Sequence, residues 1–141
     1  MFTSSARAAD AYARVNVETG IEGANPHKLI LMLYDGALLS LNQASLAMAD
    51  KNIPKKGREI SRALDIISNG LQNSLNQEVG GELTDRLNAL YDYMCDRLLF
   101  ANLKNDQGAL KEVIGLLADL RGAWEEIAND PAVLSQNRAA A

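Results

Sequence analysis

The sequence predicts an all-α protein, an antiparallel up-down-up-down four-helix bundle with a mobile N-terminal segment. Two observations carry this prediction. Apolar residues recur every three or four positions through four long segments, and almost nothing alternates in the manner of a strand. The segments have matched lengths and short connections, which makes neighbouring helices antiparallel. With 141 residues, 48% of them hydrophobic, we expect one domain with a substantial core.

The first predicted helix spans residues 26–49. Asn25 is a favourable N-cap, because its side chain can accept a hydrogen bond from an unpaired backbone N–H. Pro26 fits the first helical position. The almost unbroken apolar run that follows predicts a helix covered on two sides, and the second side is a candidate partner surface. The predicted core stripe comprises Ile30, Leu33, Ala37, Leu41, Ala44 and Met48.

The second predicted helix spans residues 53–78, with Asn52 as its cap. Gly80 and Gly81 follow it and indicate a stop, since both reach left-handed backbone conformations at low cost. Its predicted core stripe comprises Ile60, Leu64, Ile67, Leu71 and Leu75.

The third predicted helix spans residues 82–103. Glu82 favours a helix start and can pair with Arg86 one turn later. Asn105 and Asp106 then cap a fourth helix over residues 106–128. The two core stripes are Leu83, Leu87, Leu90, Met94, Leu98 and Ala101, then Leu110, Val113, Leu117, Leu120, Trp124 and Ile127.

The domain organisation that follows has three parts. Residues 1–24 are expected to be a flexible N-terminal lid segment, because Gly20 and Gly23 loosen a stretch with weak structure of its own. Residues 25–129 are the bundle. Pro131 prevents much further helix, and residues 130–141 are expected to be a frayed tail.

Composition argues against several classes of protein. The net charge is −4 and the isoelectric point is near 4.9, and no helical face carries a Lys/Arg cluster, so no nucleic-acid partner is expected. No apolar stretch approaches the roughly 20 residues of a bilayer span, and no signal peptide is seen, so no membrane insertion is expected. A single cysteine excludes an intrachain disulfide. The cytoplasm is the simplest compartment.

The sequence offers no chemistry for catalysis. His27 is the only histidine, so neither a di-iron site nor a zinc cluster is expected, and no cofactor or metal is predicted. His27 is interpreted as a solvated residue of the first helical turn. Cys95 is interpreted as a buried, inert thiol. We therefore expect no enzymatic activity.

Apolar residues lie outside the four core stripes. They are Leu31, Leu38 and Leu39 on the first helix, Ile66 on the second, and Leu99, Phe100 and Leu103 on the third. Singly, each is interpreted as a residue that broadens the core. Together they indicate a groove for an amphipathic partner, because exposed apolar strips usually mark interaction sites.

Two tyrosines are weighed separately from these apolar residues. Tyr34 and Tyr91 each fall one step off a core stripe, beside an aspartate. They are interpreted either as half-buried residues at the core edge or as edges of the groove with a polar tip. Near the N-terminus, Tyr12, Val15 and Val17 are apolar anchors that let the segment dock on the bundle or swing away from it.

The chain resembles a known family, the flagellar secretion chaperones FliS. The resemblance covers nearly the whole length and rests on the order and spacing of short motifs. The N-terminal half contributes Ala11-Tyr12-Ala13, Val15-Asn16-Val17-Glu18, Pro26-His27, Leu29-Ile30, Met32-Leu33-Tyr34-Asp35-Gly36, Ala63-Leu64-Asp65-Ile66-Ile67 and Asn69-Gly70-Leu71. The rest contributes Gly80-Gly81-Glu82, Leu90-Tyr91-Asp92-Tyr93-Met94, Arg97-Leu98-Leu99, Ala101-Asn102-Leu103 and Ala123-Trp124. Ala9 departs from the pattern, where a bulkier apolar residue is expected.

The resemblance implies a chaperone that binds the disordered C-terminal region of newly made flagellin in the cytoplasm. It also implies delivery to the cytoplasmic domain of the export-gate component FlhA, with the N-terminal tyrosine segment taking part. We expect a flagellin-binding groove formed by Leu31, Tyr34, Leu38, Ile66, Tyr91 and Leu99, and a lid and export-gate contact formed by Tyr12, Val15 and Val17.

Two alternatives remain open. A structural bundle would associate with itself through the same apolar stripe, for example as a homodimer of the cargo-free protein. A ligand-binding or catalytic bundle would instead hold a cofactor or metal.

Overall fold

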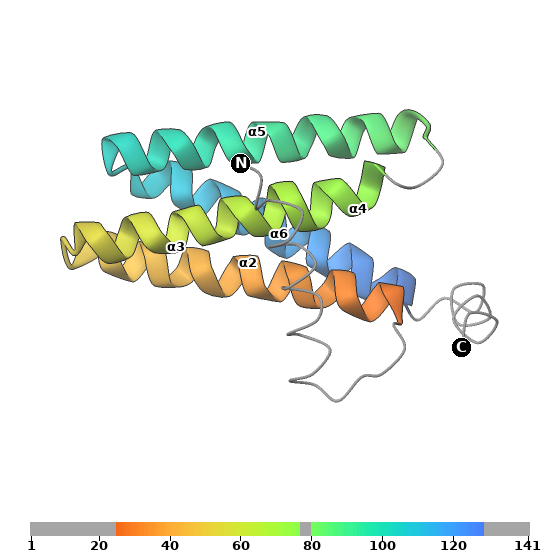
Figure 1. The fold of residues 1–141 in the computed structure, drawn as a ribbon, viewed down its shortest axis with the longest axis horizontal. Coiled ribbons are helices and arrows are strands. Elements are labelled where there is room, and N and C mark those ends of the chain that lie inside the picture. The colour runs from red at the N-terminus through yellow and green to blue at the C-terminus, as the bar shows by residue number, and fades with distance from the viewer. Residues whose placement is uncertain (1–24, 77–79, 129–141) are drawn as a thin grey trace.

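The computed structural model describes residues 25–76 and 80–128, and within these ranges it contains helices and no strand. The helices form an antiparallel four-helix bundle, as Figure 1 shows, so the predicted fold class is confirmed. The lid residues Tyr12, Val15 and Val17 lie outside the described residues, and so does the tail from residue 129.

The bundle consists of four rods. They are α2 (Pro26–Ala49), the succession α3 (Ile53–Asp65), η1 (Ile66–Gln72) and α4 (Asn73–Asn76), then α5 (Glu82–Lys104) and α6 (Gln107–Ala128). α2 packs against α3 and α6, while α5 packs against α6 and η1. The connections α2–α3 and α5–α6 lie at one end, which we call the turn end. The start of α2 and the end of α6 lie at the other, which we call the open end (Figure 1).

The helix starts follow from their capping residues. The Asn25 side chain accepts a hydrogen bond from the Lys28 backbone N–H at 3.2 Å, and Asn52 accepts one from Lys55 at 3.2 Å. Asp106 accepts one from Ala109 at 2.8 Å and so caps α6. Each bond satisfies a backbone donor that the first helical turn leaves unpaired.

The second rod departs from a regular α-helix. Residues Ile66–Gln72 form a π-helical stretch between α3 and α4. Gly70 lies within it, and a Cβ placed there would come 3.2 Å from Leu33 of α2, so this close approach requires glycine. A π-helical turn inserts a residue and rotates the face that follows. Periodicity alone therefore misses it.

The core lies along the middle of the bundle. Its buried members include Leu41, Ile60, Met94, Leu98 and Leu117. All five residues belong to the predicted core stripes. At the open end, by contrast, the stripe residues Leu83 and Ile127 are exposed. Burying each Leu or Ile contributes about 1.5–3 kcal/mol relative to exposure.

The turn end is closed by polar contacts as well as by packing. Lys56 is 3% exposed, and its Nζ donates to the backbone oxygen of Asn102 at 2.9 Å and to Oδ1 of Asn105 at 2.5 Å. Gln107 joins α6 to α2 by accepting from Ser45 Oγ at 2.9 Å and donating to the Ser45 backbone oxygen at 2.8 Å. These contacts join α3 to α5 and α6 to α2 at the turn end.

α2 is long and apolar enough to cross a membrane by length and composition alone, contrary to the expectation from the sequence. The core helix of a water-exposed bundle passes the same test. Here eight residues of α2 are buried inside the bundle, including Leu33, Ala37 and Leu41. The burial of this face accounts for part of the apolar run, whereas Leu39 and Leu46 of the same helix are exposed.

Candidate functional site

An apolar pocket of about 270 Å³ lies at the open end of the bundle. Every rod contributes to it. Its lining comprises Ile30, Tyr34, Leu71, Ser74, Leu75, Leu83, Thr84, Leu87, Tyr91, Leu120, Ala123, Trp124 and Ile127. Pockets that are mostly apolar, with a few polar groups, are the usual form of binding sites.

Two tyrosines form the polar part of this pocket. The hydroxyls of Tyr34 and Tyr91 lie 2.6 Å apart and share a hydrogen bond that joins α2 to α5 through the bundle interior. Burial raises the pKa of both phenols above the ordinary value, and Tyr34 raises that of Tyr91 further. Both hydroxyls therefore stay neutral at physiological pH and can donate or accept one further hydrogen bond.

The placement of these tyrosines departs from the sequence interpretation. Both were expected as half-buried edges, yet each side chain is only 3% exposed. The mutual hydrogen bond lets the two polar tips enter the core, because a buried hydroxyl needs a partner. They do line one pocket, although the remaining predicted groove residues do not.

A stacked pair of rings closes one side of the open end. Trp124 of α6 stacks on His27 of α2 with ring centroids 4.5 Å apart, and its Nε1 donates to the His27 backbone oxygen at 2.8 Å. His27 is therefore a half-buried packing residue, and the prediction of a solvated side chain was wrong. Its Nδ1 is buried with no hydrogen-bond partner among the described residues.

The mouth of the pocket exposes two residues that were predicted for the core. Leu83 is 71% exposed and Ile127 is 46% exposed. Leu83 lies in the first turn of α5 and Ile127 in the last turn of α6. The apolar stripe continues to the tip of each helix, but the bundle supplies no packing partner there. Periodicity therefore assigned to the core two residues that instead leave apolar area exposed at the mouth.

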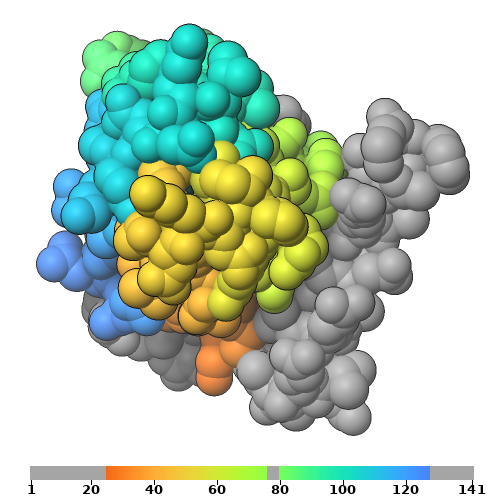
Figure 2. All heavy atoms as spheres, turned by 90° about the vertical axis from the view of Figure 1, so that its left-hand side faces the viewer, coloured from red at the N-terminus to blue at the C-terminus, as the bar shows by residue number. Residues whose placement is uncertain are grey.

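A second apolar surface covers the last turns of α5. Leu99 is 55% exposed, Phe100 39% and Leu103 77%, and we call these three residues the α5 patch. Arg97 lies over the Phe100 ring, 5.1 Å from its centroid, and its Nε donates to Glu112 at 2.8 Å. Figure 2 shows the turn end, where the last turns of α5 (teal) lie above the start of α3 (yellow). Leu99 is thus the predicted groove residue that is most accessible to a partner.

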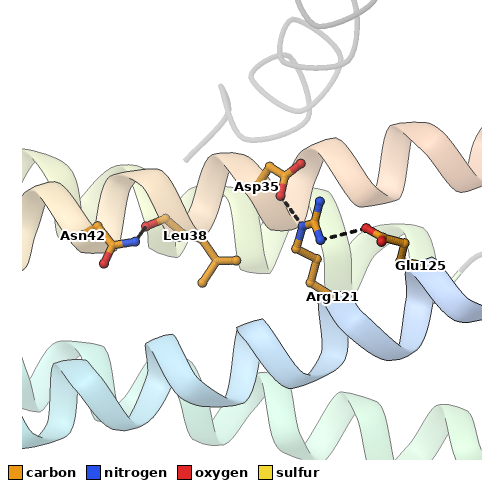
Figure 3. Close-up of polar contacts among 5 residues, drawn as sticks. All are labelled: Asp35, Leu38, Asn42, Arg121 and Glu125. Atoms are coloured by element: carbon orange, nitrogen blue, oxygen red, sulfur yellow. Dashed lines mark hydrogen bonds and ion pairs between the residues drawn. The ribbon is translucent and has the colours of Figure 1, made fainter.

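The other predicted groove residues are distributed over different seams. Leu31 and Leu38 are partly buried on α2, and Leu38 points toward α6 beside the ion pairs that Arg121 makes with Asp35 and Glu125 (Figure 3). Ile66 packs near Gly36 on the opposite side of α2. A Cβ placed on Gly36 would lie 3.4 Å from Cδ1 of Ile66. The structure therefore does not bring Leu31, Leu38, Ile66 and Leu99 into one groove.

The outward face of α2 carries a third apolar surface. Leu39 is 56% exposed and Leu46 61%, and the partly buried Met32 precedes Leu39 by seven residues. We call Met32, Leu39 and Leu46 the α2 outer stripe. Leu39 was singled out from the sequence, whereas Leu46 was not. Its spacing of seven residues from Leu39 is the signal that would have found it.

We next consider groups that could bind a metal ion or act as a nucleophile among the described residues. Over residues 25–76 and 80–128, no three His, Cys, Asp or Glu side chains are grouped to hold a metal ion. Cys95 is half-buried, and burial, followed by the negative charges of Asp92 and Asp96, raises its pKa to about 11. A thiol with such a pKa is a poor nucleophile. The arrangement suits binding of apolar chains.

The comparison with known proteins adds the family. The model of the family "Flagellar protein FliS" matches residues 8–131. This chain belongs to the FliS family. The flagellar secretion chaperone FliS of Salmonella typhimurium is 47% identical over 127 residues, covering 90% of this chain and 93% of the relative.

Relatives from other bacteria also match. The flagellar secretion chaperone FliS of Escherichia coli is 44% identical over 92% of this chain and 96% of the relative. That of Bacillus subtilis is 39% identical over 82% of each chain. The FliS resemblance seen in the sequence is therefore confirmed, and with it membership in a family of flagellar export chaperones.

Proposed function

We propose that this protein is a cytoplasmic export chaperone that binds the C-terminal region of flagellin, prevents its premature polymerisation and delivers it to the flagellar export gate. Family membership supports this assignment, since the relatives are named flagellar secretion chaperones. The observation that carries it is the exposure of apolar side chains over several faces of a well-packed bundle. Leu99 and Leu103 are 55% and 77% exposed, and exposed apolar patches of this kind usually mark interaction sites.

The mechanism is coupled folding of the cargo on preformed apolar surfaces. A disordered segment that folds on binding buries roughly 1,000–3,000 Å² and pays an ordering cost, so a large contact area gives only moderate net affinity. Moderate affinity suits a chaperone that must release its cargo later. While bound, the apolar face of the cargo is covered and cannot join other flagellin chains.

The predicted groove residues differ in how a partner would reach them. Leu99 is accessible on the α5 patch without any change in the bundle. Tyr34 and Tyr91 are reached through the open-end pocket, where their hydroxyls offer hydrogen bonds to a cargo backbone. Leu31, Leu38 and Ile66 would contribute where cargo lies over the seams of α2. We propose all six as contacts on these separate surfaces.

The test is isothermal titration calorimetry with a peptide spanning the C-terminal region of the organism's own flagellin. We expect stoichiometric binding with a large negative heat-capacity change, because apolar surface is buried.

Leu99→Asp and Leu31→Asp should each weaken binding and preserve helicity in circular dichroism. Ala89→Asp is the matched control, since Ala89 is exposed on the same helix outside the patch. Unchanged affinity of both Leu variants would refute the proposed contacts, and no binding by the folded wild-type protein would refute the function.

The N-terminal segment carries a second part of the proposal. We propose that Tyr12, Val15 and Val17 occupy part of the apolar surface in the cargo-free protein and contact the cytoplasmic domain of FlhA once cargo displaces them. A lid of this kind lowers the apparent affinity by the fraction of open molecules. Deleting residues 1–17 should therefore tighten flagellin binding and weaken capture by FlhA. Equal or weaker flagellin binding would contradict the lid.

A further inference from the structure

The open-end pocket is not fully covered by the described helices. Leu83 and Ile127 stand at its mouth, 71% and 46% exposed, although both continue apolar stripes that are buried elsewhere in the bundle. The pocket of about 270 Å³ has room for more than one branched side chain, since an apolar cavity of about 150 Å³ is enough to bind benzene. Filling such a space with apolar atoms removes its lining from water and is favourable.

The chain leaves the bundle directly beside this pocket. The lining residues that α6 supplies are Leu120, Ala123, Trp124 and Ile127. Since α6 ends at Ala128, the tail (residues 129–141) starts one residue past the mouth. The first lining residue of α2 is Ile30, which lies a full turn inside that helix, so the segment before α2 joins the bundle farther from the pocket.

The sequence of the tail offers an apolar pair at a suitable distance. Val133 and Leu134 are its branched apolar residues, and the rest of the tail is polar, charged, alanine or Pro131. Pro131 lacks a backbone N–H and disfavours a helical conformation of the residue before it, so the chain can turn away from the axis of α6 there. The path from Ala128 to Leu134 spans at most about 20 Å. The pocket wall on α6 is only about 10 Å long, so the pair can reach into the pocket.

We propose that Val133 and Leu134 dock in the open-end pocket and cover its mouth. Tethering makes weak docking sufficient, because a short linker gives an effective concentration in the millimolar range and a millimolar dissociation constant then leaves about half of the molecules docked. Any ligand of the pocket must displace the tail, which lowers its apparent affinity by the undocked fraction. The docking pair lies beyond residue 131, where the match to the FliS family model ends, so family membership implies nothing about it.

The fluorescence of Trp124 tests this docking, because Trp124 lines the pocket and is the only tryptophan of the chain. In the full-length protein, the double variant Val133→Ser/Leu134→Ser should raise the acrylamide quenching constant of Trp124 and shift its emission to longer wavelength. Gln136→Ser/Asn137→Ser is the matched control, since it alters two polar residues of the same tail and should leave both quantities unchanged. Circular dichroism checks that helicity is preserved. Equal quenching in the docking variant and the wild-type protein would overturn the proposal.

The same measurement separates the tail from the N-terminal segment as the occupant. Deleting residues 1–17 should leave the quenching of Trp124 unchanged if the tail fills the pocket. Stronger quenching after this deletion, with no change in the tail variant, would assign the pocket to the N-terminal segment and overturn the proposal. The assay contains no flagellin, so its outcome does not depend on the proposed cargo.

An intramolecular cross-link locates the docked pair. Cys95→Ala removes the only native thiol, and in that background Leu83→Cys/Leu134→Cys should form a disulfide rapidly upon oxidation of dilute protein. Leu103→Cys/Leu134→Cys is the matched control. Leu103 is 77% exposed on the same helix, but it lies about 30 Å farther along α5, beyond the reach of the tail, so no disulfide should form.

A third substitution distinguishes docking from random encounter of the two thiols. Val133→Ser, added to the Leu83→Cys/Leu134→Cys protein, should slow disulfide formation several-fold, because it removes one of the two docking side chains. A rate that Val133→Ser leaves unchanged would contradict docking, since a tail that only samples the mouth at random does not depend on that side chain.

Discussion

The turn end and the open end of the bundle use similar residues but are closed in different ways. At the turn end, Lys56 and Gln107 join neighbouring rods by hydrogen bonds, and the helices connect through short, capped turns. At the open end, a 270 Å³ pocket replaces the core, and Leu83 and Ile127 project into solvent. The apolar stripe of a helix thus serves packing at one end and remains available for binding at the other.

We therefore expect stability to depend mainly on the turn end and binding mainly on the open end. Regions with many buried contacts open only with the whole fold, whereas regions with few contacts open locally at low cost. The turn end is expected to hold the bundle together. At the open end a pocket replaces core packing, so this end is expected to adapt to a bound chain without unfolding the rest.

The largest expected effect comes from a pair of leucines on the same predicted stripe of α5. Leu98 is fully buried and Leu83 is 71% exposed. Leu98→Ala should lower the free energy of unfolding by about 2–5 kcal/mol, because it removes buried methyl groups and leaves a cavity. Leu83→Ala should change it by less than about 0.5 kcal/mol. Urea denaturation followed by circular dichroism measures both, and equal losses would remove the distinction between core and mouth.

Lys56 tests the closure of the turn end. Lys56→Met keeps the length of the side chain but leaves Asn102 and Asn105 without their donor, which should cost about 1–3 kcal/mol of unfolding free energy. Lys111→Met is the matched control, because Lys111 is exposed on α6, and it should be nearly neutral. A loss that is the same for both variants would show that the buried ammonium does not hold the turn end.

Alkaline pH probes the tyrosine pair of the open end. The pKa values of Tyr34 and Tyr91 are raised in the folded protein, mainly by burial, above the unfolded value of about 10. Their contribution is therefore complete below about pH 10 and is lost as pH rises further, by up to about 1.4 kcal/mol per pH unit for each hydroxyl. Thermal unfolding between pH 8 and 11 measures this loss. The double variant Tyr34→Phe/Tyr91→Phe should lose less stability over that range, and an identical pH profile would argue against the pair.

The smallest effect is expected from the exposed ion pair at the start of α5. Nη2 of Arg86 lies 2.5 Å from Oε1 of Glu82, and the two side chains are 74% and 79% exposed. Glu82→Gln should change the free energy of unfolding by less than about 0.5 kcal/mol, since solvent screens such pairs. Because this pair belongs to the open end, a loss above 1 kcal/mol would mean that charges there matter more than packing.

Much of the fold was predictable because helix formation depends on residues close in sequence. Asn25, Asn52 and Asp106 cap the helices that they were predicted to cap. The buried residues Leu41, Met94 and Leu117 also follow from the 3.6-residue period. The π-helical stretch around Gly70 was not predictable, since it depends on the approach of Leu33 from another helix.

The candidate site was less predictable than the core. Leu99 was singled out correctly as an apolar residue outside the core stripe, whereas Tyr34 and Tyr91 were expected at the edge and are buried. A tyrosine enters a core only when its hydroxyl finds a partner, and here that partner is 57 residues away in the chain. Local patterns contain no information about such a distant contact.

By itself the sequence determined the all-α class, the direction of most core side chains and the likeness to the FliS family. Only the tertiary structure decided how far along each helix the core extends, which apolar residues remain in water, and which hydroxyls meet. The physical reason is that periodicity sets the direction of a side chain, whereas burial requires a neighbouring helix at the same height. At Leu83 and Ile127 that neighbour is missing, and the core ends in a pocket.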